Sequence, residues 1–194
     1  MKRITIVVNK FIIIIAMEKY KNKFRINSAR ANWHDYNSGL YFITICTQAK
    51  VCYFGEIING EMQLNELGKV AVQFMKDVNS HYPYAEVPLF VIMPNHVHAI
   101  ISIEDKIYQS QNHAVSGESK DFRMQQVVQN RGVLSDCIAK YKAAVTRYAN
   151  KNNVLFNWQA RFHDHIIRDA FDLNKIADYI ENNPKKWEVD KFYL

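Results

Sequence analysis

Two apolar runs joined by a two-residue turn constrain the fold most. The first run spans residues 87–93 and the second spans residues 96–103. Pro94 and Asn95 stand between them. Proline fixes φ in a turn, and asparagine tolerates a left-handed backbone. The pattern predicts two consecutive β-strands.

The rest of the chain alternates strand and helix signals. Asn59-Gly60 between two short apolar runs is a strong hairpin signal, and Asn65 is suited to cap the helix that follows. In chain order we predict strands at 41–47, 54–58 and 62–64, a helix at 65–82, strands at 87–93 and 96–103, a polar loop at about 104–131, a helix at 134–149, a strand at 162–168 and a helix at 173–182. This order predicts one α+β domain with an antiparallel sheet.

Positive charge is concentrated at the N-terminus. Residues 1–30 carry eight Lys or Arg and one Glu, whereas the remaining chain is nearly neutral. A basic segment favours a polyanionic partner, because binding to phosphates releases counterions; a solubilising tail would have the same composition. We predict a basic extension over residues 1–24, which is either a disordered segment or the product of an upstream start, and a single domain over residues 25–194.

Composition indicates a folded chain in a reducing compartment. Hydrophobic residues make up 48% of the chain, which is enough for a sizeable core. The three cysteines form no C-x-x-C pair, so neither a disulfide framework nor a structural zinc site is expected. The apolar stretch at 4–16 is interrupted by Asn9-Lys10 and is too short to span a bilayer. We therefore expect a cytoplasmic protein without a membrane partner.

The His96-Val97-His98 sequence is the sharpest chemical feature. Residues i and i+2 of a strand point to the same face, so the two imidazoles should lie side by side, as two ligands of one divalent metal would. Two histidines on a half-exposed strand would show the same spacing. His163 and His165 form a second such pair, and spacing alone does not decide between the pairs.

The last predicted helix carries the second chemical feature. At 100° per residue, Tyr179 and Asn183 share the face on which Ile176 and Ile180 lie. An asparagine on an apolar face needs a polar partner, and a metal held by the sheet histidines would be one. Tyr179 could equally be an amphipathic core tyrosine. Pro184 disfavours a helical conformation of Asn183.

Four segments carry a family resemblance. They read YFITI (41–45), FVIMPNHVHAI (90–100), WQARFHDHIIR (158–168) and DYIENNP (178–184). In this order they resemble the REP-associated tyrosine transposases, a branch of the insertion-sequence-200-like HUH transposases (His, bulky hydrophobe, His). The resemblance covers about residues 25–187.

The resemblance implies a fold, a reaction and a site. The fold is a ferredoxin-like antiparallel sheet with helices packed on it. The reaction is cleavage and joining of single-stranded or hairpin DNA through a 5′-phosphotyrosine, with Mg²⁺ or Mn²⁺ as cofactor. The implied catalytic residues are Tyr179, His96 and His98, and the implied metal ligands are His96, His98 and Asn183. His165 would support the site.

Other assignments remain open. Arg25, Arg30, Lys140, Lys142 and Arg147 are candidates to hold the DNA backbone, and each could equally be solvated surface. A homodimer is also left open. Two alternative functions are a catalytically inactive protein that binds DNA hairpins and a metal-dependent phosphohydrolase that makes no covalent tyrosine link.

Overall fold

The computed structural model describes residues 38–104 and 132–193. The predicted extension at 1–24, almost all of the predicted loop at 104–131, Arg25 and Arg30 lie outside these residues. The elements are β1 (Gly39–Cys46), η1 (Gln48–Lys50), β2 (Gly55–Ile58), β3 (Glu61–Leu64), α1 (Glu66–Lys76), α2 (Val78–His81), β4 (Ala85–Ile92), β5 (His96–Ile103), α5 (Val133–Lys151), β6 (His163–Ile166), α6 (Ala170–Asn182) and η2 (Pro184–Val189). The predicted order of strands and long helices is confirmed.

Four strands form one antiparallel sheet in the order β4-β5-β1-β6. Helix α1 connects β1 to β4 and α5 connects β5 to β6, which is the β-α-β-β-α-β arrangement of ferredoxin-like folds. The predicted α+β class and antiparallel sheet are thus confirmed. Strands β2 and β3 form a separate hairpin, whose turn residues Asn59 and Gly60 both have positive φ, as a type I′ turn requires.

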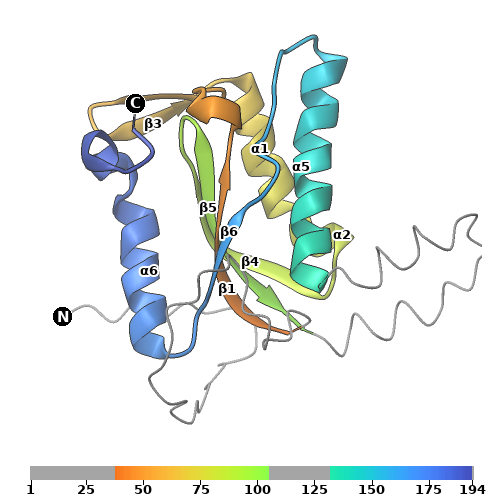
Figure 1. The fold of residues 1–194 in the computed structure, drawn as a ribbon, viewed down its shortest axis with the longest axis vertical. Helices are drawn as coiled ribbons and strands as arrows, with labels where there is room; N and C mark the ends of the chain where they lie inside the picture. The colour runs from red at the N-terminus through yellow and green to blue at the C-terminus, as the bar shows by residue number, and fades with distance from the viewer. Residues whose placement is uncertain (1–37, 105–131, 194) are drawn as a thin grey trace, which may run out of the picture.

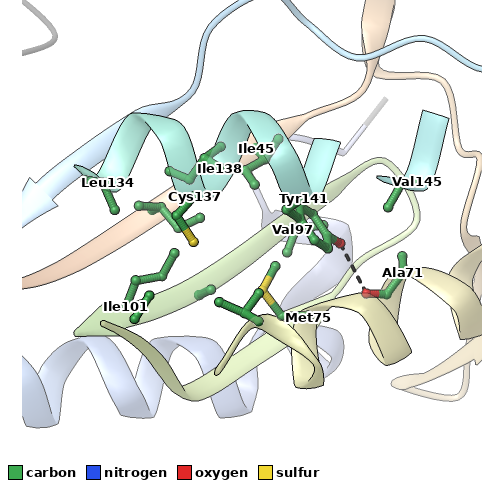
Figure 2. Packing of buried hydrophobic residues seen from close by; sticks show 14 of the residues in the cluster. Ile45, Ala71, Met75, Val97, Ile101, Leu134, Cys137, Ile138, Tyr141 and Val145 are labelled. Carbon is green, nitrogen blue, oxygen red and sulfur yellow. Dashed lines mark hydrogen bonds between the residues drawn. The ribbon is translucent and has the colours of Figure 1, made fainter. Parts of the chain in front are cut away.

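Helices α1 and α5 cover one face of the sheet and enclose the main core (Figures 1 and 2). Side chains of α5, among them Ile138 and Val145, pack toward Val97 and Ile101 of β5. The Tyr141 hydroxyl donates a hydrogen bond to the carbonyl of Ala71 in α1 at 3.3 Å. This face therefore belongs to the hydrophobic core.

Helix α6 covers the opposite face (Figure 1). Its residues Ile176 and Ile180 pack in a smaller cluster with Ile100 of β5. The side chains of β5 thus alternate between the two faces of the sheet: Val97 faces the core under α5, and Ile100 faces α6. Because alternate residues of a strand share a face, His96 and His98 lie on the same face as Ile100 and point toward α6.

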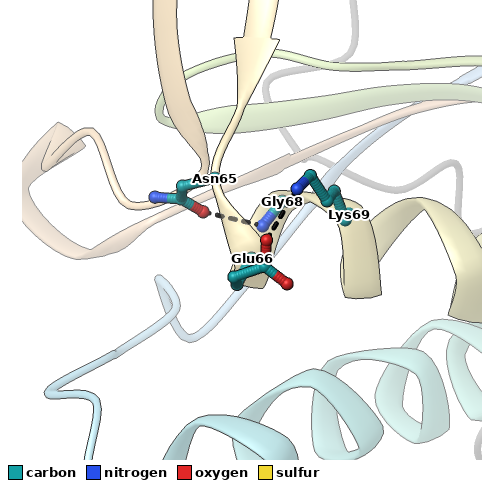
Figure 3. A network of polar contacts seen from close by, with 4 residues as sticks. All are labelled: Asn65, Glu66, Gly68 and Lys69. Atoms are coloured by element: carbon teal, nitrogen blue, oxygen red, sulfur yellow. Dashed lines mark hydrogen bonds and ion pairs between the residues drawn. The ribbon is translucent and has the colours of Figure 1, made fainter.

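The helix predicted over residues 65–82 is interrupted. Asn65 caps it as expected, since its side-chain oxygen accepts the N–H of Gly68 at 2.9 Å (Figure 3). Helix α1 ends at Lys76, however, and the separate single turn α2 follows Asp77. At Asp77 ψ is −2°, which breaks the helical path, and the Gln73 amide binds both carboxylate oxygens of Asp77.

In the described ranges no helix is long and apolar enough to cross a bilayer.

Candidate active site and metal centre

His96 and His98 lie side by side under α6. Both side chains are buried, and their ring centroids are 4.4 Å apart. Strand β5 is central, so the hydrogen bonds of β4 and β1 fix the backbone that carries the pair. The spacing of the two histidines on one face is therefore a property of the sheet rather than of a flexible loop.

The hydrogen bonds of His96 show which of its two ring nitrogens has no hydrogen-bond partner. The Asn95 amide nitrogen donates to the carbonyls of Lys50 and Phe192, so its oxygen is the atom facing His96 Nδ1 at 2.8 Å. We therefore assign the proton to Nδ1. The opposite atom, Nε2, is buried and has no hydrogen-bond partner. Burial lowers the pKa of His96 to about 4, so the ring is neutral at pH 7 and keeps an unshared electron pair on Nε2.

His98 is held between the sheet and α6. Its Nδ1 lies 2.9 Å from the Thr44 hydroxyl of β1, and its Nε2 lies 3.2 Å from the Tyr179 hydroxyl. Burial, followed by the neighbouring His96, holds the pKa of His98 well below its ordinary value. This imidazole is thus also neutral at pH 7.

Tyr179 is the α6 residue that reaches the histidines. Its side chain is 37% exposed, and its hydroxyl donates to Asp190 Oδ2 at 3.1 Å while contacting His98 Nε2. Burial, reinforced by the Asp190 carboxylate, raises the pKa of Tyr179 to about 12. The phenol is therefore protonated at pH 7, with its oxygen close to the histidine pair.

Asn183 lies one turn after Tyr179 and is buried. Its amide nitrogen donates to Asp190 Oδ2 at 2.9 Å, whereas its Oδ1 is buried without a hydrogen-bond partner. Its φ of −58° and ψ of −43° are helical, so the expectation that Pro184 disfavours this conformation is wrong here. The one-turn spacing from Tyr179 is consequently preserved.

Asp190 was not anticipated from the sequence. It follows η2, and its ligand oxygen and one nitrogen from each of His96 and His98 all lie within 4.8 Å of one another. Its second oxygen accepts the N–H of Phe192 at 2.7 Å, and the Phe192 ring lies 4.5 Å from that of His96. The sequence indicated only that Asn183, on the apolar face of the last predicted helix, needs a polar partner; it did not indicate that Asp190 is that partner.

The other predicted residues lie elsewhere. His165 on β6 pairs with Asp172 in the first turn of α6 at 2.7 Å and so ties that helix to the edge strand. Lys140, Lys142 and Arg147 lie on α5, which covers the face opposite α6 (Figure 1). Lys142 donates to the carbonyls of Gln159 and Ala160, and burial lowers the pKa of its ammonium group.

Known proteins provide the comparison for this geometry. No protein-family model matches the chain. A protein of Haemophilus influenzae, named only as uncharacterized, is 38% identical over 169 residues, which cover 86% of this chain and 92% of that protein. A "putative REP-associated tyrosine transposase" of the same organism is 28% identical over 153 residues, which cover 76% of this chain and 71% of that protein.

A solved structure shares the fold. It is a REP-associated tyrosine transposase bound to a REP hairpin, with a TM-score of 0.50 and 18% identity, and the match covers 90% of this chain and 77% of that one. These observations define a class of protein. Its members have a four-stranded antiparallel sheet with a buried histidine pair beneath a helix that carries a tyrosine. Within that class, the chain belongs to the insertion-sequence-200-like family of REP-associated tyrosine transposases.

Proposed function

We propose that this protein cleaves and rejoins single-stranded DNA through a covalent link to Tyr179. The observation that carries the proposal is the 3.2 Å contact between the Tyr179 hydroxyl and His98 Nε2, beside two buried atoms without hydrogen-bond partners, His96 Nε2 and Asn183 Oδ1. A nucleophile next to unsatisfied ligand atoms suits a metal-assisted transfer reaction.

The residues fit a divalent ion, Mg²⁺ or Mn²⁺. Buried polar atoms without partners are uncommon and call for an explanation, and a metal would satisfy both of them. We assign its ligands as His96, His98 and Asn183. Asp190 is the alternative oxygen ligand, but its oxygens already accept hydrogen bonds from Tyr179, Asn183 and Phe192. When bound, the ion would polarise the scissile phosphate.

Tyr179 is the proposed nucleophile. Its oxygen attacks the phosphorus, the bond from phosphorus to the 3′-oxygen breaks, and the DNA remains attached through a 5′-phosphotyrosine. The phenolic proton already points to Asp190 Oδ2 in a 3.1 Å hydrogen bond, so Asp190 is placed to receive it. The departing 3′-oxygen takes up a proton and becomes a free 3′-hydroxyl. A 3′-hydroxyl from another strand reverses these steps, and joining therefore needs no external energy source.

The proposed partner is single-stranded or hairpin DNA. The relative of known structure is described as bound to a REP hairpin, and we extend that partner class to this chain as part of the proposal. Reaction at one strand requires unpaired bases next to the cleaved bond, and such bases can stack on aromatic side chains. A cytoplasmic location would give access to this substrate.

A covalent adduct tests the proposal. Hairpin DNA labelled at its 3′ end is incubated with the protein and Mn²⁺ and then separated on a denaturing gel. We expect the label to shift to the mass of a protein–DNA adduct, whereas a 5′ label should be released on a fragment that ends in a 3′-hydroxyl. Tyr179→Phe should form no adduct, and Tyr193→Phe, which removes an exposed hydroxyl elsewhere in the C-terminal segment, should behave as wild type.

Two outcomes would favour the alternative functions. Cleavage by Tyr179→Phe but not by His96→Ala would identify a metal-dependent phosphohydrolase that does not need the tyrosine. Tight hairpin binding without cleavage at any metal concentration would identify a catalytically inactive binding protein. Mass spectrometry of the DNA-linked peptide would show directly whether Tyr179 carries the link.

A further inference from the structure

A groove lies between the α1–α2 segment and α5, on the side of the sheet opposite the histidines. Its volume is about 530 Å³. We call it the α5 groove and define it by aromatic residues Phe74, Tyr82 and Tyr148 and by basic residues Lys140, Arg147 and Lys151. Tyr82 and Tyr148 are half-buried, so part of each side chain remains accessible.

The basic residues of the α5 groove form one stripe. Lys140, Arg147 and Lys151 are separated by seven and four residues, so they recur on one side of a 3.6-residue helix. Lys140 pairs with Asp136 at 2.7 Å and also lies 4.7 Å from the centre of the Tyr82 ring. Within the described residues, Arg147 and Lys151 make no ion pair, and no Asp or Glu lines the groove.

We infer that the α5 groove binds single-stranded nucleic acid. Aromatic rings beside a row of cations are the combination that holds such strands, because bases stack on the rings while phosphates meet the charges. Tyr82 and Tyr148 would receive bases, and Arg147 and Lys151 would contact phosphates. A duplex fits this chemistry poorly, because its base faces are stacked inside the helix. The inference rests on the proposed function only in taking DNA as the partner.

The α5 groove is separate from the reacting phosphate. Helices α5 and α6 lie on opposite sides of the sheet (Figure 1), and Tyr179 belongs to α6. The groove would therefore hold a part of the strand away from the cleaved bond, which makes its residues positioning residues. They contribute to affinity and not to the covalent step itself.

Binding of labelled oligothymidine to the Tyr179→Phe protein tests the inference without cleavage. Arg147→Ala/Lys151→Ala should weaken binding and reduce the slope of log affinity against log salt by about 1.4, since each single-strand phosphate contact contributes roughly 0.7. Lys69→Ala/Lys76→Ala is the matched control, because it removes two exposed charges from α1 outside the groove. The control should leave the slope unchanged.

The rings supply a second measurement. Tyr148→Phe keeps the ring and should bind normally, whereas Tyr148→Ser should lose roughly 5-fold to 150-fold in affinity, the range expected for one stacked base. Circular dichroism would verify that the serine variant is folded. Retained affinity in Tyr148→Ser, or equal salt slopes for the groove and control variants, would overturn the inference.

Competition and adduct assays separate the remaining outcomes. If polyglutamate displaces oligothymidine as well as unlabelled DNA does, the groove is a site for acidic peptides and the inference fails. If groove variants bind normally while the wild-type chain forms the tyrosine adduct, only this inference fails. If groove variants lose affinity but no adduct ever forms, only the proposed function fails.

Discussion

Asn95 orients the histidine that we propose as a metal ligand. Its amide oxygen faces Nδ1 of His96 and leaves Nε2 unpaired. Partners of this kind hold the ligand ring in place and set its tautomer, and losing one typically costs 10- to 100-fold in metal affinity. We expect Asn95→Ala to weaken Mn²⁺ binding by roughly this factor in isothermal titration calorimetry. Asn152→Ala, at the end of α5, should leave it unchanged.

The neutral histidines predict a pH dependence of stability. Burial lowers the pKa of His96 to about 4 and holds the pKa of His98 well below normal, whereas both would titrate near 6.5 in the unfolded chain. Below about pH 6.5 the unfolded chain therefore binds protons that the folded chain does not. The neutral imidazoles therefore contribute fully to the free energy of unfolding above about pH 6.5. This contribution is lost as the pH falls toward 4.

Urea unfolding with EDTA present would measure this effect. We expect the midpoint to fall between pH 7 and pH 5, and to fall less in His96→Gln/His98→Gln, which retains the carboxylates but lacks the two imidazoles. An equal fall in both proteins would assign the loss of stability to other groups.

The sequence located some of the site residues but not all of them. His96 and His98 could be assigned to one face because a strand has a period of two, and Tyr179 and Asn183 because a helix has a period of 3.6. Asp190 lies in an aperiodic segment after η2, so no pattern places it near the histidines. Asn95 indicated only a turn, since its side-chain partners Lys50 and Phe192 are distant in sequence.

At the level of elements, helix ends were harder to predict than helix faces. The Asn65 cap was identified because the residue precedes a clear apolar period. Helix α6 begins at Ala170, three residues before the predicted start, because the Asp169 side chain accepts the N–H of Asp172 and caps it. The first turn of α6 carries the acidic Asp172 and an exposed Phe171, so a search based on the buried apolar stripe begins only at Leu173.

Gly68 shows how closely α1 approaches the β2–β3 segment. A Cβ at this position would collide with the carbonyl oxygen of Phe54 and lie 2.8 Å from Cδ2 of Leu64. Alanine favours a helix by up to about 1 kcal/mol over glycine, but overpacking typically costs about 1–3 kcal/mol. We expect Gly68→Ala to lower the melting temperature, measured by circular dichroism. Lys76→Ala in the same helix should not, and a more stable Gly68→Ala protein would contradict the predicted collision.

For the whole molecule, the order of elements predicted one α+β domain with an antiparallel sheet, and the family resemblance implied the ferredoxin-like arrangement. The apolar face of the last helix, with Tyr179 and Asn183 on it, predicted that this helix covers the histidines. The sequence did not predict where the basic side chains of α5 lie or what they contact. Lys140, Lys142 and Arg147 all belong to α5, yet Lys142 is held by the carbonyls of Gln159 and Ala160. Such long-range packing has no signature in local spacing.

The sheet that separates α5 from α6 has a consequence for substrate length. Because the two helices lie on opposite faces (Figure 1), a strand that contacts both the α5 groove and Tyr179 must pass around the sheet. Oligonucleotides below a threshold length can reach only one face. In a series shortened stepwise at the end remote from the cleaved bond, adduct formation should drop abruptly at one length, and Arg147→Ala/Lys151→Ala should remove that step. A smooth decline in both proteins would mean that the α5 groove does not set a minimum length for the oligonucleotide.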